Sequence, residues 1–521
     1  MTWQPEVDEI NRRRALAEAC GGPAAIEKQH AAGKLTVRER IDKLLDPKTF
    51  REVGKLAGRA TYKDGELAAF EPAPYVMGIG KIDGRPVAVG GEDYTIRAGT
   101  GFGSDRRKGG QGGFIEDLAF EYRIPLVNLI DGTGGTVNTV KRKGYTVVPG
   151  FGMDGFERSV QLLGIVPVVS AVMGTVAGGP AGRALLAHWT VMVRGTSQIF
   201  AAGPPVVERA FGTKLNKEEL GGAKVSADTA GTIDNVAADE EDCLRQIRRF
   251  LSFMPQNAWE LAPNARSGDA VDRCEDALLS IIPRNDRQAY DMRKLIGMIV
   301  DQGSGFEIQA TFGRAVIATL ARMDGYPVGI IANNPMYGGI IDVKAARKQA
   351  HFTELCDAFN IPIIFLVDVP GLLVGPESEA AAIMRFGLQS RYLLGQITVP
   401  VFTVLVRKCY GVAGGNVIDR AGLNFKIAWP SAHWGSLPVE GGVKAAYRRE
   451  IESAPDPKAR EAELEAELRA LSSPFRTAEA FAVEDIIDPR ETRPYLCQFI
   501  EAFQGRLKTQ LGPKLRAGVR P

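Results

Sequence analysis

The stretch YRIPLVNLIDGTGG, residues 122–135, recurs later in the chain as FNIPIIFLVDVPG, residues 359–371. In each copy an Ile-Pro pair opens a short apolar run that ends in an aspartate. This is Asp131 in the first copy and Asp368 in the second, 237 positions apart. Apolar runs of this length between proline and glycine are typical of buried strands that end in a tight turn. The repetition indicates that one ancestral unit was duplicated.

Three further pairs of segments extend the match in both directions. They are IVPVVSAVMGTVAGG (165–179) with TVPVFTVLVRKCYGVAGG (398–415), KIDGRPVAV (81–89) with RMDGYPVGI (322–330), and LLDPKTFREV (44–53) with IVDQGSGFEI (299–308). The first pair aligns Gly178 with Gly414. We therefore expect two domains, residues 1–260 and 261–521, since 521 residues exceed what one hydrophobic core organises. The boundary is expected in the Pro-, Asn- and Asp-rich segment 254–287.

The composition is that of a soluble globular protein and argues against several functions. The formal net charge is +2, with 64 basic and 62 acidic residues interspersed, so no nucleic-acid partner is predicted. The six cysteines form no CxxC pair, which argues against a disulfide framework and a zinc site. The N-terminus lacks a continuous apolar run, and the apolar segment 162–182 is interrupted by prolines and glycines. We therefore predict a cytoplasmic protein without a membrane span.

The pattern of apolar runs predicts an α/β fold. Strands are expected at 75–79, 85–90, 126–130 and 166–172, and again at 328–331, 363–367 and 402–406. Helices are expected at 113–122, 154–163, 345–359, 380–394 and 456–471, the last of them charged and solvated. Uniformly apolar strands that alternate with helices are typical of a parallel sheet with both faces covered.

Glycine-rich turns follow the predicted strands at 131–135, 177–180 and 411–415. Each can be a simple connection between strand and helix, but their recurrence in both units favours a function. Backbone N–H groups at the start of a helix bind anions, and they form an oxyanion hole if the anion is an enolate. The chain has four histidines, each predicted to be structural, and no GxSxG, HExxH or GxxxxGK[ST] motif. The GFGMDG match at 150–155 lacks the acidic residue that a dinucleotide site needs. An enzyme that relies on backbone donors and has no obvious side-chain base would need a base from its substrate or cofactor.

Five motifs resemble those of the biotin-dependent carboxyltransferases, most closely the β subunits of propionyl-CoA-type acyl-CoA carboxylases. They are GKLTVRERIDKLLD (33–46), EELGGAK (218–224), ARMDGYPVGIIANNP (321–335), CDAFNIPIIFLVDVPG (356–371) and RKCYGVAGG (407–415). The resemblance covers essentially the whole chain. It implies two tandem crotonase-like (ClpP/crotonase) ββα-superhelix domains and a hexamer built as a trimer of dimers. Acyl-CoA would bind the N-terminal domain of one subunit and carboxybiotin the C-terminal domain of its partner.

The resemblance also implies site residues. Backbone N–H groups at Gly178 and Gly179 would hold the thioester enolate, and those at Val412 and Ala413 would hold the ureido oxygen of biotin. Further residues are implied at the acyl-CoA site (Gly134, Gly135, Lys108 and Gly415) and at the biotin site (Gly371, Gly411 and Tyr410). No metal is implied in this chain.

The biotin must come from another chain, because no AMKM acceptor motif occurs. The expected partner is a biotin carboxylase and biotin carboxyl carrier, as one α subunit or two. Three alternatives stay open: a decarboxylase subunit that runs the transfer in reverse, a non-catalytic paralogue that binds CoA or scaffolds a complex, and a crotonase-type hydratase or isomerase.

The chain departs from the family pattern at several places, among them Ser226 and Asp234, which replace two histidines that often follow LGGA. DGTGGTVN (131–138) replaces the usual DSGGAR, and GPESEAAAIMRFG (375–387) replaces GTxQExxGIIRHGA. Short-chain enzymes carry YGGAYD where this chain reads YGVAGG (410–415). The missing side chain at Gly415 leads us to expect a substrate other than, or broader than, propionyl-CoA.

Overall fold

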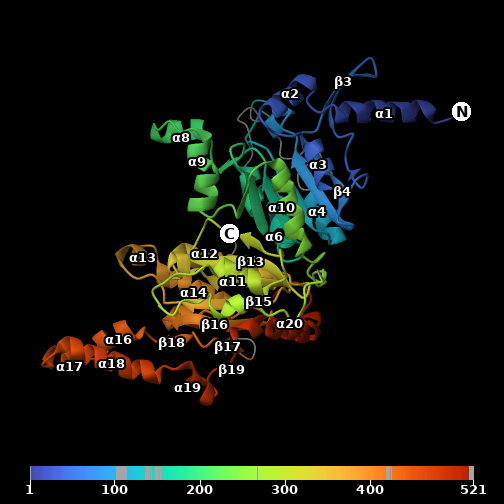
Figure 1. Ribbon diagram of the computed structural model, residues 1–521. Helices are drawn as coiled ribbons and strands as arrows, with labels where there is room; N and C mark the ends of the chain where they lie inside the picture. The colour runs from blue at the N-terminus through green and yellow to red at the C-terminus, as the bar shows by residue number, and fades with distance from the viewer. Residues whose placement is uncertain are drawn as a thin grey trace. The chain divides into compact units, whose positions relative to one another are not determined.

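The computed structural model describes residues 2–100, 114–134, 141, 144–146, 155–266, 268–417, 423 and 425–515, and all structural statements concern these residues. The chain divides into two compact units, residues 1–260 and 261–520, here called unit 1 and unit 2 (Figure 1). The division falls within the segment 254–287 that the sequence singles out. Gly135 and Lys108 lie outside the described residues.

Unit 1 contains a seven-stranded sheet in the order β1-β4-β5-β6-β7-β9-β11. Its strands are β1 (Arg51–Glu52), β4 (Tyr75–Ile82), β5 (Arg85–Glu92), β6 (Leu126–Ile130), β7 (Val168–Val172), β9 (Trp189–Val193) and β11 (Asn235–Ala237). Two small sheets pair β2 (Gly58–Lys63) with β3 (Glu66–Pro72), and β8 (Thr175–Ala177) with β10 (Gln198–Phe200). The helices are α1 (Gln4–Glu18), α2 (Pro23–Ala31), α3 (Val37–Leu44), α4 (Phe114–Tyr122), α6 (Gly155–Leu162), α7 (Gly179–Leu185), α8 (Pro204–Phe211), α9 (Lys217–Gly221) and α10 (Glu240–Ser252).

Unit 2 repeats this sheet in the order β12-β13-β14-β15-β16-β17-β19, with β18 also paired to β16. Its strands are β12 (Phe306–Ile308), β13 (Val316–Met323), β14 (Tyr326–Asn333), β15 (Ile363–Val369), β16 (Val401–Tyr410), β17 (Lys426–Ala428), β18 (His433–Gly435) and β19 (Asp485–Ile486). Its helices are α11 (Met292–Ile299), α12 (Val343–Ala358), α13 (Pro376–Ala380), α14 (Ile383–Leu394), α15 (Gly411–Gly415), α16 (Val439–Ala446), α17 (Arg448–Ser453), α18 (Pro457–Leu471), α19 (Pro474–Glu479) and α20 (Thr492–Lys508).

The α/β fold is confirmed, but the sheets are mixed and not purely parallel as the apolar runs predicted. The first three strands of each large sheet are antiparallel, and the following strands are parallel. The predicted helix 380–394 is also divided, since Ala382 has a φ of 62° between α13 and α14. The helix predicted at 456–471 is present as α18, with the Asp456 carboxylate accepting hydrogen bonds at its start.

The duplication is visible in the hairpins that open the two sheets. Asp83–Gly84 turn β4 into β5 with φ values of 49° and 78°, and Asp324–Gly325 turn β13 into β14 with 48° and 78°. The Asp46 carboxylate accepts hydrogen bonds from both turn N–H groups of the first hairpin, at 3.2 and 2.8 Å. Asp301 does the same in the second, at 3.1 and 2.7 Å. The weak match between segments 44–53 and 299–308 therefore reflects a shared turn support.

The strands that lead to the glycine turns correct one expected correspondence. β7 and β16 pair with their neighbours at positions 233 residues apart, as Leu126 opposite Val168 and Ile363 opposite Val401 show. The same offset relates β8 to the end of β16, while β10 and β18, which pair with them in the same way, are 235 residues apart. Gly178 is thus the counterpart of Gly411 and not of Gly414. Matching the identical VAGG segments placed the alignment of the two copies three residues out of register.

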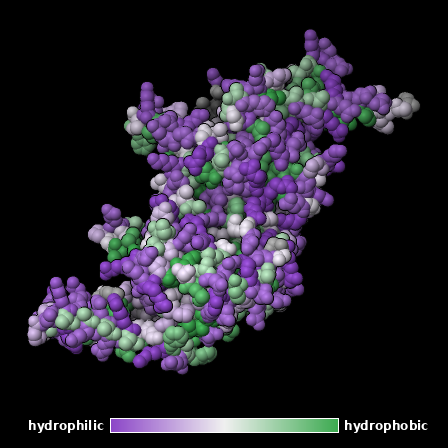
Figure 2. Space-filling view, viewed as in Figure 1, coloured by the Kyte–Doolittle hydropathy of each residue, from purple (hydrophilic) through white to green (hydrophobic). Residues whose placement is uncertain are grey.

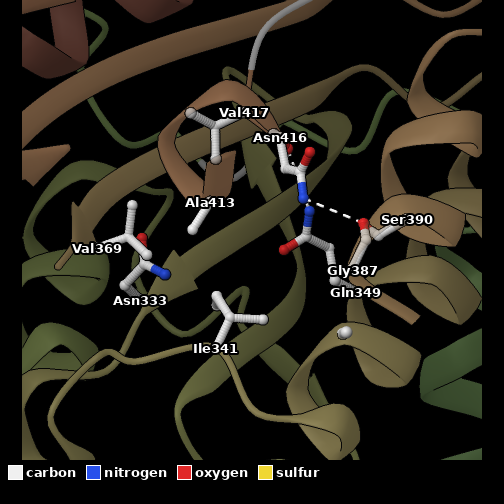
Figure 3. Close-up of a pocket in the computed structure, with 10 residues that line it drawn as sticks. Asn333, Ile341, Gln349, Val369, Gly387, Ser390, Ala413, Asn416 and Val417 are labelled. Carbon is white, nitrogen blue, oxygen red and sulfur yellow. Dashed lines mark hydrogen bonds between the residues drawn. The ribbon is translucent and has the colours of Figure 1, made fainter. Parts of the chain in front are cut away.

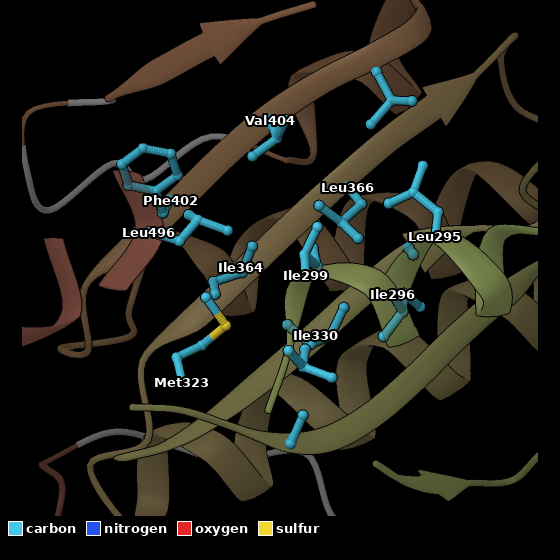
Figure 4. Close-up of a cluster of buried hydrophobic side chains, with 14 of the residues drawn as sticks. Leu295, Ile296, Ile299, Met323, Ile330, Ile364, Leu366, Phe402, Val404 and Leu496 are labelled. Carbon is cyan, nitrogen blue, oxygen red and sulfur yellow. The ribbon is translucent and has the colours of Figure 1, made fainter. Parts of the chain in front are cut away.

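The largest core described is that of unit 2 (Figure 4). It joins α11 and α20 to one face of the sheet, through side chains that include Leu295, Ile364, Phe402, Trp429 and Leu496. Unit 1 has two smaller clusters, which include Leu126 and Ile130 of β6 respectively and therefore lie against the same face of its sheet. No described helix has the length and apolarity needed to cross a membrane.

Lys348 on α12 is buried with backbone carbonyls as its acceptors. Its ammonium donates to the oxygens of Gln309, Phe312 and Val316 at 2.8, 3.3 and 2.8 Å. Burial lowers the pKa of Lys348 from 10.5 to about 8. The lysine thus fastens the loop 309–316 to the helix, and it is easier to deprotonate in the folded protein than in the unfolded chain.

This shift predicts that the free energy of unfolding rises with pH between 8 and 10.5. In that window the unfolded chain keeps a proton that the folded protein has lost, so raising the pH favours folding, by up to about 3 kcal/mol. The Lys348→Met variant should lose this slope in urea unfolding at a series of pH values, while the exposed Lys344→Met on the same helix should keep it. An unchanged slope in Lys348→Met would contradict the assignment.

Candidate active site

The first glycine turn lies at the end of β8. Gly178 has φ 64° and ψ −128°, a conformation that favours glycine, and it directly precedes α7. A Cβ atom at Gly178 would contact nothing within 4 Å, so the backbone conformation and not space requires glycine. Gly179 is the first residue of α7, and the first N–H groups of a helix have no partner within it. The predicted acyl-site residues therefore form a strand-to-helix turn with donors available.

The turn that begins at Asp131 lies against this one. Gly134 has a φ of 79°, and a Cβ there would lie 2.8 Å from the carbonyl oxygen of Ala177 at the end of β8. The structure thus brings Gly134 together with the Gly178–Gly179 turn, whereas Gly415, which was also predicted at the acyl-CoA site, lies in unit 2 on α15. The segments that contain Gly134 and Ala177 lie too close together to leave room for a side chain at Gly134.

A buried carboxylate connects the two turns of unit 1. Glu92, at the end of β5, pairs with Arg183 on α7 and also accepts the backbone N–H of Asp131 at 3.2 Å. Arg183 donates to the hydroxyl of Tyr75 at 3.0 Å, and Glu116 lies 4.0 Å away. Burial raises the pKa values of Glu116 and Tyr75. Sequence reasoning missed this cluster, because its members lie far apart along the chain.

A second buried ionic cluster holds the carboxylate of Asp131 in place. The guanidinium of Arg40, which is 0% exposed, donates to Asp131 at 3.0 Å, to the carbonyl of Met173 at 3.1 Å and to Glu240 through Nε at 2.9 Å. The ammonium of Lys34 lies 2.6 Å from the same Asp131 oxygen. The helix α3 that carries Arg40 begins with a Thr36–Glu39 capping box, a signal present in the sequence. Its buried arginine was not expected.

The repeated aspartate of unit 2 is held in a similar way by different residues. Asp368 accepts from Nε of Arg407 at 3.0 Å and from the N–H of Lys408 at 3.1 Å, both on β16. Its own N–H donates to the side chain of Asn333 at 3.1 Å, as that of Asp131 does to Glu92. Gly371 follows β15, and its carbonyl accepts the N–H of Ile341 at 3.1 Å.

The second glycine turn forms the short helix α15 directly after β16. Gly411 has a φ of 60°, Val412 is 49% exposed and Ala413 is buried. A Cβ at Gly414 would lie 2.8 Å from the sulfur of Cys409, whereas one at Gly415 would contact nothing within 4 Å. Tyr410, the last strand residue, is buried, with its hydroxyl oxygen 2.7 Å from Nδ1 of His433. All the predicted biotin-site residues except Gly371 thus belong to one turn.

A small cavity lies behind this turn (Figure 3). Its volume is about 10 Å³, roughly the space of one water molecule. Residues of α12, α14 and α15 line it, and two hydrogen bonds cross it: Nδ2 of Asn416 donates to Gly387 at 3.1 Å, and Nε2 of Gln349 donates to the Asn416 carbonyl at 3.2 Å. The turn is therefore fastened to both helices at its C-terminal end.

A larger pocket of about 280 Å³ lies on the other side of the turn. Its lining is mainly apolar or without side chains, and comprises Thr403, Leu405, Cys409, Gly411, Gly414, Gly415, Val417, Lys426, Trp434, Gly435, Ala482 and Val483. Among the described residues no cluster of His, Cys, Asp or Glu could hold a metal ion. The geometry offers backbone donors and an apolar pocket.

Comparisons with known proteins show what the chain is similar to. Residues 28–516 match the carboxyl transferase domain. The propionyl-CoA carboxylase carboxyltransferase subunit of Haloferax mediterranei is 36% identical over 517 residues, covering 98% of each chain. The methylmalonyl-CoA decarboxylase subunit alpha of Veillonella parvula is 33% identical over 496 residues, 95% of this chain and 94% of that one. The crystal structure of the transcarboxylase 12S hexamer, with methylmalonyl-CoA and methylmalonic acid bound, has a TM-score of 0.87 at 32% identity and covers 100% of this chain and 99% of that one.

Proposed function

The chain belongs to the carboxyl transferase family, and we propose that it is the carboxyltransferase subunit of a biotin-dependent acyl-CoA carboxylase. The observation that carries the proposal is the pair of matched glycine turns. Gly178 and Gly411 occupy equivalent positions with φ values of 64° and 60°, each at the point where a strand passes into a helix. A transfer between two carbonyl-type groups needs two sites for developing negative charge, and the chain has two.

The residues of each turn would act by binding and orienting. In unit 1, N–H groups at Gly178–Gly179 would stabilise the enolate oxygen of the acyl thioester, with the Gly134 turn beside it. In unit 2, N–H groups at Val412–Ala413 would hold the ureido oxygen of biotin, between Gly371 and Tyr410. Carboxybiotin would supply the CO₂ and then a basic nitrogen, so the protein needs no side-chain base. Holding both reactants in place is the main contribution of such a site.

Two kinds of partner follow from this role. The biotin would arrive on a separate biotin carboxylase and carrier subunit. A second copy of the chain is also expected, because the related 12S protein is a hexamer. Unit 2 has apolar side chains suited to such contacts, at Leu373, Val374, Met384, Leu388 and Tyr392 on and beside α13 and α14. Figure 2 shows hydrophobic residues at the surface around α13, where Val374 is 83% exposed.

The direction of transfer distinguishes the main proposal from its nearest alternative. The relatives include both a carboxylase subunit and a decarboxylase subunit, and the same turns would serve either. A pull-down of the native protein with streptavidin detection tests this. An associated ATP-dependent biotin carboxylase, with bicarbonate-dependent carboxylation of acyl-CoA, is the expected result. A membrane pump in the complex would indicate decarboxylation. No biotinylated partner and no activity would favour a scaffold protein.

The acyl group is proposed to be longer or more branched than propionyl, because Gly415 opens onto the 280 Å³ pocket. Gly415→Leu places a side chain in that space, where no positive φ strains the substitution. We expect kcat/KM for long or branched acyl-CoAs to fall about tenfold or more, with a smaller effect on propionyl-CoA. Gly441→Leu, at an exposed position on α16, is the control. Wild-type protein that prefers acetyl- and propionyl-CoA would contradict this.

A further inference from the structure

The two glycine turns are built on equivalent strand pairs that carry different side chains. In unit 1, Thr175–Ala177 pair with Gln198–Phe200 in parallel register. In unit 2, Lys408–Tyr410 pair with His433–Gly435 in the same way. Tyr410 therefore occupies the position of Ala177, immediately before the positive-φ glycine, and His433 occupies the position of Gln198.

The tyrosine and the histidine of unit 2 are in contact across these strands. The Tyr410 hydroxyl lies 2.7 Å from Nδ1 of His433, and Nε2 lies 3.6 Å from the carboxylate of Asp286. That carboxylate favours the tautomer with its proton on Nε2, which leaves Nδ1 as an acceptor. The tyrosine then donates to the imidazole, and its ring is fixed directly before Gly411.

Unit 1 shows that this contact is not needed to form the strand pair. Ala177 has no polar side chain, yet β8 and β10 pair in the same register and Gly178 adopts nearly the same φ as Gly411. The contact is present only at the turn assigned to biotin. We propose that His433 is a positioning residue of this turn, which acts through Tyr410 to orient the N–H groups of Val412 and Ala413. The inference rests on the proposed function of the turn.

The charges around His433 indicate which protonation state of the imidazole orients the turn through Tyr410. Burial lowers the pKa of His433, and the surrounding charges oppose one another: Asp286 and Asp368 raise it, whereas Lys408 and Arg407 lower it. The neutral imidazole is therefore favoured more than in an ordinary histidine, and its protonation needs a lower pH. Once protonated, Nδ1 becomes a donor and can no longer accept from the tyrosine. Biotin binding at the turn should weaken in acid.

Carboxyl transfer from methylmalonyl-CoA to free biotin tests the proposal on the full-length protein. The carboxyl group passes to the biotin nitrogen, and the proton of that nitrogen passes to the α-carbon, which yields propionyl-CoA and carboxybiotin. We expect His433→Ala and Tyr410→Phe each to raise the KM for biotin about 5- to 10-fold, the value of one hydrogen bond, without changing the KM for methylmalonyl-CoA. The double variant should be no worse than either single variant. His433→Gln, which keeps an acceptor that does not titrate, should have a near-normal KM without the rise in acid.

Three results would overturn the positioning role: additive effects in the double variant, an equal rise in the KM for methylmalonyl-CoA, or an acid-side rise that survives in His433→Gln. Wild-type protein that transfers no carboxyl group at any pH, either from methylmalonyl-CoA or from carboxylated acyl-CoAs with longer or branched chains, would instead refute the proposed function. In that case saturation-transfer NMR with biotin decides the inference. Weaker binding by both single variants supports it, and equal or absent binding overturns it.

Discussion

Replacing Arg40 with methionine is expected to lower the free energy of unfolding of unit 1 by about 3–5 kcal/mol. The guanidinium is 0% exposed and contacts two carboxylates, those of Asp131 and Glu240. Methionine fills much of the same space but leaves Glu240 and one side of Asp131 without a cation. The cost is that of uncompensated buried charge, which exceeds the net value of an ion pair. Urea unfolding followed by the fluorescence of Trp189, buried against Phe250, measures it.

The control for this variant is Lys43→Met on the same helix. Lys43 pairs with Glu241 at 2.7 Å, but both side chains are exposed, so solvent can replace the interaction. We expect no measurable loss of stability there. Equal losses in the two variants would show that burial of the charges is not what makes Arg40 important.

Replacing Gly178 with alanine is expected to reduce kcat/KM for carboxyl transfer about 10²- to 10³-fold, the usual effect of losing one oxyanion donor. A side chain is rarely compatible with φ 64° and ψ −128°, so the backbone must change at the residue that precedes α7. The first N–H of the helix then turns away from the enolate oxygen. Steady-state kinetics with methylmalonyl-CoA and biotin, beside a thermal unfolding curve, measures the two consequences separately.

Gly195 provides the matched control for backbone strain. It has a φ of 77° in the turn between β9 and β10, and a Cβ there would contact nothing within 4 Å. Gly195→Ala should lower stability to a similar extent and leave kcat/KM unchanged. Activity lost equally in both variants would remove the special role of Gly178.

The sequence predicted the parts of this structure that depend on local pattern. The apolar runs at 126–130 and 363–367 are central strands, as expected, because branched residues between proline and glycine have few other solutions. The antiparallel hairpins were missed, although the Asp-Gly pairs at 83–84 and 324–325 carry a hairpin signal. The alignment of Gly178 with Gly414 was wrong because it matched identical residue letters. The strand register shows which positions of the two units correspond.

The ionic clusters around the first glycine turn were beyond the reach of local pattern. Arg40 meets Glu240 across 200 positions, and Arg183 meets Glu92 across 91. No spacing rule links residues so far apart, and an arginine considered by itself is usually a surface residue. His433 was expected to be structural for the same reason. The strand register that sets it opposite Lys408, beside Tyr410, distinguishes it from His188, whose ring nitrogens contact the backbone of Val168 and Leu163.

The break between β7 and β8 has a mechanical consequence. In unit 1 the chain leaves the large sheet at Gly174, where a Cβ would lie 1.9 Å from Asp131, and enters a separate two-stranded sheet before the Gly178 turn. In unit 2 a single strand, β16, runs from the large sheet to the turn, with an irregularity in its pairing between Leu405 and Cys409. The Gly411 turn is thus supported by the large sheet, whereas the Gly178 turn is supported by a two-stranded sheet of its own.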